Sequence, residues 1–165
     1  MAGFDPFSLG EEQYTTPKVE EEMKSDSMTA LRFSTAVESG RLEIRVPRQE
    51  FLERVKASAT SVGDSFYLSA TDMEILALAL ELKAAGKVPQ VVTDDYSIQN
   101  VATQLGIEFV SLATFGIRRL LNWVRYCPAC HREYPANYRS TTCAVCGTRL
   151  KRKPRKKETK TKAPM

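Results

Sequence analysis

The chain has 165 residues, of which 42% are hydrophobic and 27% charged. These are ordinary globular values, so the composition excludes a wholly disordered chain. No apolar run approaches the roughly 18 residues that a membrane span needs, and residues 1–10 lack the basic and apolar regions of a secretory signal. We therefore expect a soluble, cytoplasmic protein without a membrane partner, with room for one domain and a small module.

The net charge of +4 is unevenly distributed along the chain. Residues 151–165 hold eight of the 24 Lys and Arg and one of the 20 Asp and Glu, which leaves residues 1–150 mildly acidic. Because like charges repel and nothing apolar is there to bury, we predict a disordered basic tail over 151–165. Such a tail neutralises phosphates, although a solubilising role explains the same composition.

The predicted elements alternate between helices and strands. Thr16 and Pro17 are typical of a helix start, with a hydroxyl residue at the N-cap and proline at the first helical position. Further helices are predicted over residues 28–39, 49–59, 70–85, 98–105 and 117–124, and strands over residues 42–46, 90–93 and 107–112. Strands separated by helices favour an α/β domain with a parallel sheet.

All four cysteines lie in one segment, with the pattern Cys127-x2-Cys130-x12-Cys143-x2-Cys146. Each pair is a short turn that directs two thiolates at one point, and four sulfurs in a tetrahedron suit Zn²⁺. Because all four positions are cysteines, no coordination position is left open, and we predict a structural zinc. Two disulfides or a redox pair are the alternatives, which an intracellular chain disfavours.

The cysteines divide the chain into a body over residues 1–121, a zinc ribbon over residues 122–150 and the tail over residues 151–165. A module of this size has no room for a large core, so the metal must hold it. Arginines and tyrosines surround the cysteines, a combination that suits single-stranded RNA. The alternative is that the tyrosines cover a very small core. His131 is expected to be a surface or RNA contact rather than a ligand.

Four acids of the body lie where a catalytic cation could bind. They are Glu22 after the first helix start, Asp72 in the first turn of the apolar helix, and Asp94 and Asp95 after the strand over 90–93. In an open parallel sheet, strand ends and helix starts share one edge, so the three aspartates are expected to converge there. Clustered carboxylates bind Mg²⁺ or Mn²⁺, which activate water and stabilise a phosphodiester transition state.

Each acid also has a purely structural explanation. Asp72 completes a capping box with Ser69. Asp95 serves equally well as a plain N-cap, and Glu22 is one of three consecutive acids. No Ser-His-Asp arrangement, Walker loop or Gly-x-Gly-x-x-Gly motif offers a competing chemistry.

Three segments that carry these acids resemble the PIN-domain nucleases. They are YTTPKVxxE at 14–22, LSATDMEILALA at 68–79 and VTDDYSIQNVA at 92–102. The last segment, followed by a four-cysteine ribbon, is similar to the archaeal form of the NIN-one-binding protein family. The resemblance extends from about Gly3 to Arg152.

The resemblance implies a PIN-like parallel sheet flanked by helices. It implies a metal-dependent endoribonuclease that matures the 3′ end of small-subunit (16S) ribosomal RNA during ribosome biogenesis, with Mg²⁺ or Mn²⁺ as cofactor. The partners would be the precursor RNA and the pre-small ribosomal subunit. Glu22, Asp72 and Asp95 match the family's acids in the first helix, at the apolar helix and after the fourth strand. Asp94 stands beside Asp95.

The first residues depart from the family pattern. The family opens with a central hydrophobic strand that ends in an aspartate ligand, whereas this chain begins with MAGFDP, which is similar to the loop after that strand. Asp5 is therefore not carried over. Because a missing central strand leaves buried backbone groups unpaired, at about 1–3 kcal/mol each, we expect the true start to lie upstream of Met1. A catalytically silent RNA-binding assembly factor is the alternative function, and a transcription-type zinc-ribbon protein is a third.

Overall fold

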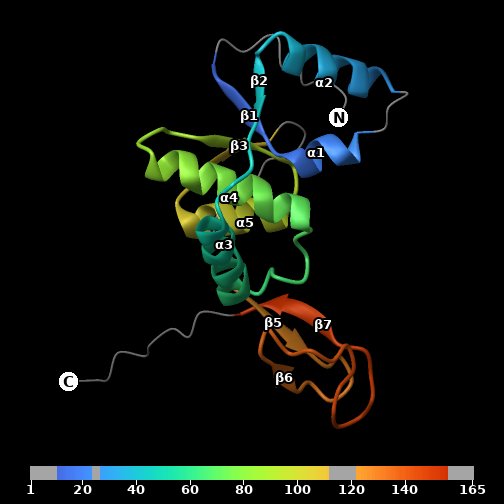
Figure 1. Ribbon diagram of the computed structural model, residues 1–165. Coiled ribbons are helices and arrows are strands. Elements are labelled where there is room, and N and C mark those ends of the chain that lie inside the picture. The colour runs from blue at the N-terminus through green and yellow to red at the C-terminus, as the bar shows by residue number, and fades with distance from the viewer. Residues whose placement is uncertain (1–10, 24–26, 112–121, 156–165) are drawn as a thin grey trace, which may run out of the picture.

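The computed structural model describes residues 11–23, 27–111 and 122–155. Its elements are β1 (Gln13–Thr15), α1 (Pro17–Glu22), α2 (Met28–Glu38), β2 (Leu42–Ile44), α3 (Gln49–Val62), α4 (Ala70–Ala84), β3 (Gln90–Val92), α5 (Tyr96–Leu105), β4 (Glu108–Val110), β5 (Trp123–Tyr126), β6 (Glu133–Tyr134) and β7 (Lys151–Pro154). Figure 1 shows a helical body with β5, β6 and β7 at one end. Every helix within these ranges is too short or too polar to cross a lipid bilayer.

The helices α1 to α5 confirm the predicted ones. α1 begins after Thr16 and α4 begins after Ser69, both at the predicted caps. α3 is three residues longer than predicted and ends at Gly63, whose φ of +85° lies in the left-handed region that favours glycine. α5 begins after Asp95, which takes the N-cap position.

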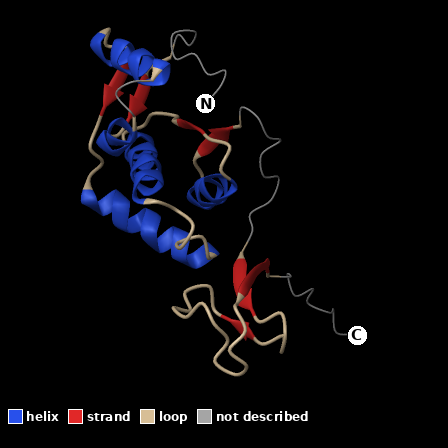
Figure 2. Cartoon of the chain, turned by 90° about the vertical axis from the view of Figure 1, so that its right-hand side faces the viewer, coloured by secondary structure: helices blue, strands red, loops and turns tan. Residues whose placement is uncertain are grey.

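The strands of the body form two separate parallel pairs among the described residues. β1 pairs with β2, and β3 pairs with β4. Figure 2 shows the two pairs apart, with helices beside them. The parallel α/β body is therefore confirmed, in the form of small sheets rather than one continuous sheet. β1 was not predicted, because three residues are too few to show a strand period.

The hydrophobic core lies between α3, α4 and α5. Val55, Leu76 and Val101 are fully buried there, one from each helix. α4 is apolar almost all round, which is the pattern of a helix enclosed by its neighbours. The core therefore fixes α4 and α5 relative to each other. Three of the candidate acids lie at or beside the N-terminal ends of these two helices.

The third sheet corrects two predictions. β5 pairs antiparallel with β6 on one side and with β7 on the other. Trp123 and Val124 therefore lie in a strand, where a helix over 117–124 was predicted; residues 117–121 lie outside the described residues. The first four residues of the predicted tail form β7. Its backbone pairs with that of β5, and Arg152 and Lys153 lie over the rings of Trp123 and Tyr126. The tail beyond Arg155 lies outside the described residues.

Candidate functional site

The four cysteines form one compact cluster in the module of residues 122–155, which we call the cysteine module. The Sγ atoms of Cys127 and Cys146 are 3.3 Å apart, and those of Cys130 and Cys143 are 3.5 Å apart. All four sulfurs lie within 4.8 Å of one another, and the cysteines are free thiols. A tetrahedral zinc site with metal–sulfur bonds of about 2.3 Å separates its sulfurs by about 3.8 Å. The cluster therefore has the donors and the size of a metal site, compatible with a zinc ribbon, and the disulfide alternative is absent from it.

Matching turns follow the first cysteine of each pair. The Gly147 backbone N–H donates to the Cys143 carbonyl at 2.9 Å, and the His131 N–H donates to the Cys127 carbonyl at the same distance. Gly147 and His131 both have a positive φ, of +72° and +60°. His131 therefore fills a backbone position of the turn, and its side chain is not among the clustered ligands.

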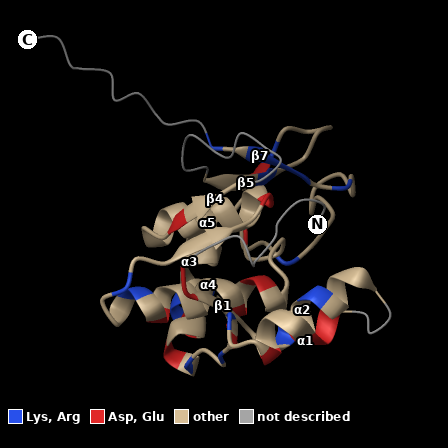
Figure 3. Ribbon diagram, turned by 90° about the horizontal axis from the view of Figure 1, so that it is seen from above, with Lys and Arg blue, Asp and Glu red and all other residues tan. Residues whose placement is uncertain are grey.

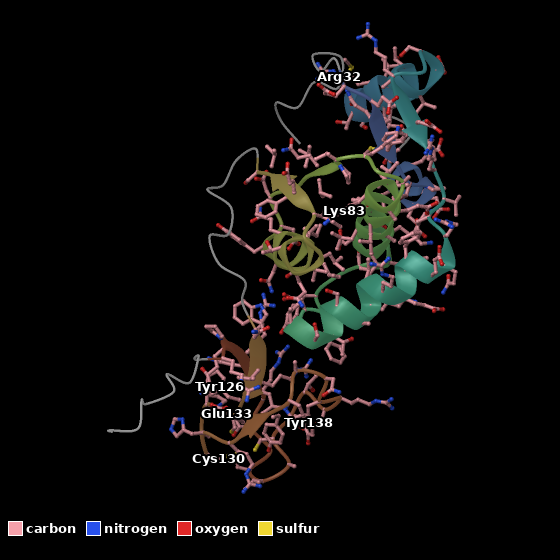
Figure 4. The ribbon with its side chains drawn as sticks, turned by 90° about the vertical axis from the view of Figure 1, so that its left-hand side faces the viewer. Arg32, Lys83, Tyr126, Cys130, Glu133 and Tyr138 are labelled. Carbon is pink, nitrogen blue, oxygen red and sulfur yellow. The ribbon has the colours of Figure 1, made fainter. Side chains whose placement is uncertain are left out.

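A buried tyrosine lowers the pKa of one thiol. The Tyr134 hydroxyl lies 3.0 Å from Cys143 Sγ, and this hydrogen bond lowers the pKa of Cys143 to about 6 and raises the pKa of Tyr134 to about 12. Since metals bind the thiolate, a thiol that ionises readily is suited to be a ligand. Figure 4 shows Tyr138 and Cys130 in the same small module.

Tyr134 and Tyr138 build a core rather than a stacking platform. Tyr134 is only 8% exposed, its ring centroid lies 4.5 Å from that of Tyr138, and Leu150 packs beside them. A ring this deeply buried has no free face for a nucleobase. The core explanation is therefore the correct one for Tyr134, and the interpretation of that tyrosine as an RNA-stacking group is wrong.

Glu22 lies beside the start of α4, next to Asp72. Its Oε1 accepts a hydrogen bond of 2.5 Å from the Thr71 hydroxyl, which joins residues 49 positions apart in the chain. The structure thus brings the acid of α1 to the turn that carries Asp72. Thr16, at the opposite end of α1, has a fully buried hydroxyl without a partner, so the predicted hydroxyl cap bond is not formed.

Asp72 and Asp95 make hydrogen bonds at the starts of helices, whereas Asp94 bonds to a residue that follows β4. Asp72 Oδ2 accepts from the Ser69 N–H at 2.8 Å, while the Ser69 hydroxyl accepts from the Asp72 N–H, so the capping box is present. Asp95 Oδ1 accepts from the Ser97 N–H at 2.6 Å. Asp94 accepts from the Ser111 hydroxyl at 2.5 Å. The structural explanations are therefore confirmed: Asp72 and Asp95 both cap helices. Each capping hydrogen bond uses only one of the two carboxylate oxygens.

The acids do not close into a coordination shell as the cysteines do. Across residues 11–23, 27–111 and 122–155, the cysteines alone bring three or more ligand atoms within 4.8 Å of one another. Within the same ranges, Glu22, Asp72 and Asp95 have no Lys or Arg at ion-pair distance. Mg²⁺ keeps several of its waters and binds through one or two carboxylates. Glu22, Asp72 and Asp95 therefore suit a hydrated hard cation by the chemistry of their carboxylate oxygens.

Sequence reasoning missed one charged residue altogether. Asp64 follows α3 and is fully buried, and burial raises its pKa despite hydrogen bonds from Asn100 and Arg152. Arg152 lies 88 positions further along the chain, so no local pattern predicts the pair. The only sequence signal is an acid directly after a glycine that ends a helix.

Comparisons with known proteins agree with this architecture. Residues 7–82 match the family model of the PIN domain of ribonuclease. The chain is 41% identical to endoribonuclease Nob1 of Methanothermobacter thermautotrophicus, over 87% of this chain and 83% of that protein. It is 38% identical to endoribonuclease Nob1 of Pyrococcus abyssi over 88% of this chain and 86% of the relative, and 37% identical to that of Methanocaldococcus jannaschii over 92% and 72%.

The fold and these matches define a PIN-domain ribonuclease with a four-cysteine metal-binding module. Within that class, the chain belongs to the Nob1 family of endoribonucleases. The resemblance predicted from the three acid-bearing segments is thereby confirmed.

Proposed function

We propose that the protein is a metal-dependent endoribonuclease that matures the 3′ end of small-subunit ribosomal RNA in the cytoplasm. Its partners are the precursor RNA and the pre-small ribosomal subunit. The observation that carries the proposal is the 41% identity to a Nob1 endoribonuclease over 144 residues. That length exceeds the predicted body over residues 1–121, so the likeness includes part of the cysteine module.

In this proposal Glu22, Asp72, Asp94 and Asp95 hold a hydrated Mg²⁺ or Mn²⁺. Such an ion supplies a water of lowered pKa and neutralises charge on the scissile phosphate. The Thr71 hydroxyl orients Glu22 by its hydrogen bond. The starts of α4 and α5 add the positive ends of two helix dipoles, which favour carboxylates and substrate phosphate alike.

The cysteine module is proposed to grip the RNA while a structural Zn²⁺ holds its fold. Four basic residues of the module that carries the cysteine cluster are exposed, namely Arg132, Arg139, Arg149 and Lys151. Guanidinium groups bind phosphates in pairs of hydrogen bonds, so this surface suits the RNA backbone. The proposed division is a nuclease body over residues 1–121 and a metal-held module that includes β7.

Replacing Asp72 with asparagine tests the acid cluster. Asparagine still accepts the Ser69 N–H and so retains the helix cap, but it removes the negative charge that a cation needs. We expect Asp72→Asn to abolish Mn²⁺-dependent cleavage while RNA binding stays within about twofold of the original. The matched control is Glu74→Gln, which removes a negative charge from the same helix. The Glu74 carboxylate is already paired with Lys18, 3.3 Å away. Unchanged cleavage by Asp72→Asn would contradict the assigned role.

A catalytically silent RNA-binding assembly factor is the second candidate. One observation favours it. Within the described residues, the four candidate acids do not form a group that could hold a metal ion, whereas the cysteines do. Under this alternative, the chain binds a precursor RNA fragment but leaves it intact in saturating Mn²⁺. Cleavage at a defined position under the same conditions would exclude it.

A further inference from the structure

The loop between α3 and α4, residues 63–69, packs directly against the cysteine module. A Cβ atom built on Gly63 would lie 2.8 Å from the Ala136 Cβ and 2.8 Å from the Trp123 carbonyl oxygen. The Arg125 guanidinium lies 4.6 Å from the centre of the Phe66 ring. Backbone and side chains of the module thus contact the loop at van der Waals distance, with no space for an added methyl group.

At the centre of this contact, a buried carboxylate meets a half-buried guanidinium. Asp64 is fully buried, and its Oδ1 lies 3.0 Å from an Arg152 nitrogen. The Arg152 guanidinium also lies close to two rings, 3.7 Å from the centre of Tyr67 and 4.3 Å from that of Trp123. Figure 3 shows basic residues on β7, the strand that carries Arg152. Arginine suits this position because its planar group stacks on rings and bonds a carboxylate at the same time.

The same carboxylate also contacts α5, one of the helices that carry candidate acids. Asp64 Oδ2 accepts a hydrogen bond of 2.6 Å from the Asn100 amide in α5, the helix that Asp95 caps. The loop that begins at Gly63 ends at Ser69, whose hydroxyl and backbone form the capping box with Asp72. Arg152 of the module is therefore linked through Asp64 to the middle of α5, and Asp64 lies in the loop that leads to the capped start of α4.

We propose that Asp64 and Arg152 form a latch that fixes the cysteine module on the body, and that Arg152 is a positioning residue for RNA cleavage. The latch sets where the basic module holds the RNA relative to Glu22, Asp72 and Asp95. The role in cleavage rests on the proposed function, whereas the latch itself does not. A contact that served stability alone would lower the melting temperature without changing how RNA is presented.

The tumbling of the two parts in solution tests the latch directly. In the full chain loaded with zinc, ¹⁵N relaxation should give one correlation time for α3–α5 and for β5–β7. In Arg152→Met the module should tumble faster than the body, with both parts still folded and the zinc content unchanged. The matched control is Lys153→Met, which removes the same charge from the next residue of β7 but breaks contacts inside the module alone, namely the 2.7 Å pair with Glu133 and the contact with the Tyr126 ring. Independent tumbling of the original protein would overturn the latch.

Kinetics on a precursor RNA fragment test the positioning role. Arg152→Met should raise KM at least tenfold while kcat changes less than threefold, because the acids are untouched but the RNA is no longer presented to them. Lys153→Met should change KM by less than threefold, and Arg152→Lys should recover only part of the loss, since it restores the charge but not the planar stack.

Asp64→Asn, which keeps the Asn100 side of the site, should reproduce the loss if Arg152→Met does not fold. Equal KM values for the Arg152→Met and Lys153→Met proteins would overturn the role. If the original protein does not cleave RNA, the proposed function fails, while the relaxation data still decide the latch.

Discussion

The pKa of Asp64 is set by opposing effects of burial and of its polar neighbours. Burial raises the pKa of Asp64 above the usual 3.8, whereas the Asn100 hydrogen bond and the charge of Arg152 oppose the rise. A raised pKa means that the folded protein retains this proton to a higher pH than the unfolded chain does. The stability that Asp64 contributes is therefore fully present below pH 3.8 and declines as the pH rises through the raised pKa.

An NMR titration of the Asp64 carboxyl carbon measures this shift. We expect its midpoint to lie above 3.8, and the unfolding free energy of the original protein relative to Asp64→Asn to fall as pH rises through that midpoint. Glu12 is the internal reference, because its hydrogen bond from Lys87 lowers its pKa below 4.5. A midpoint for Asp64 at or below 3.8 would show that the Arg152 charge outweighs burial.

Gly63 and Gly40 form a matched pair of left-handed glycines. Both have a positive φ, so alanine at either position costs about 1–2 kcal/mol of backbone strain. A Cβ atom built on Gly40 meets no atom of the described residues within 4 Å apart from its chain neighbours, whereas one built on Gly63 collides with Ala136 and Trp123. We expect Gly63→Ala to lose about 1–3 kcal/mol more than Gly40→Ala in urea unfolding. Equal losses would mean that loop 63–69 is not packed on the module.

The predictability of single residues depends on whether their partners are near in sequence. The cysteine cluster was predicted in full, because two short turns determine its geometry, and the capping role of Asp72 followed from Ser69 three residues earlier. Asp64 was missed because its partner Arg152 is 88 positions away and belongs to a different part of the fold.

Among the elements, helices were predicted better than strands. α4 is 15 residues long with a cap at its start, and such a length contains several turns of pattern. β1, by contrast, has three residues, and β7 has the composition of a basic tail. β7 forms because its backbone pairs with β5. In addition, Arg152 and Lys153 of β7 lie over the rings of Trp123 and Tyr126 in β5. That stabilisation comes entirely from another element, so local composition gives no sign of it.

Removing the metal should unfold the cysteine module and leave the body folded. Metal binding supplies the folding energy of such modules, whereas α3, α4 and α5 have their own buried core. The single tryptophan, Trp123, lies in β5, so its fluorescence reports on the module. We expect a chelator or Cys143→Ser to shift this emission to the red with little loss of helical circular dichroism. Unchanged emission after the complete release of about one zinc per chain would contradict the account.

At the scale of the whole molecule, the class was predictable but the arrangement of its parts was not. Three acid-bearing segments and four cysteines identified a nuclease body and a metal module, and the family match confirms that resemblance. The pose of the module depends on contacts between Arg152, Asp64 and two rings, which no repeat or period encodes. The contact between α1 and α4 was equally beyond sequence patterns, because the Glu22–Thr71 hydrogen bond joins residues 49 positions apart.

The most direct test of the central claim is to map the 3′ end of a precursor small-subunit RNA fragment after incubation with the full chain. The account predicts one new 3′ end that forms with Mn²⁺ or Mg²⁺ and disappears when both ions are chelated. RNA that stays bound and intact at every concentration of either ion would contradict it.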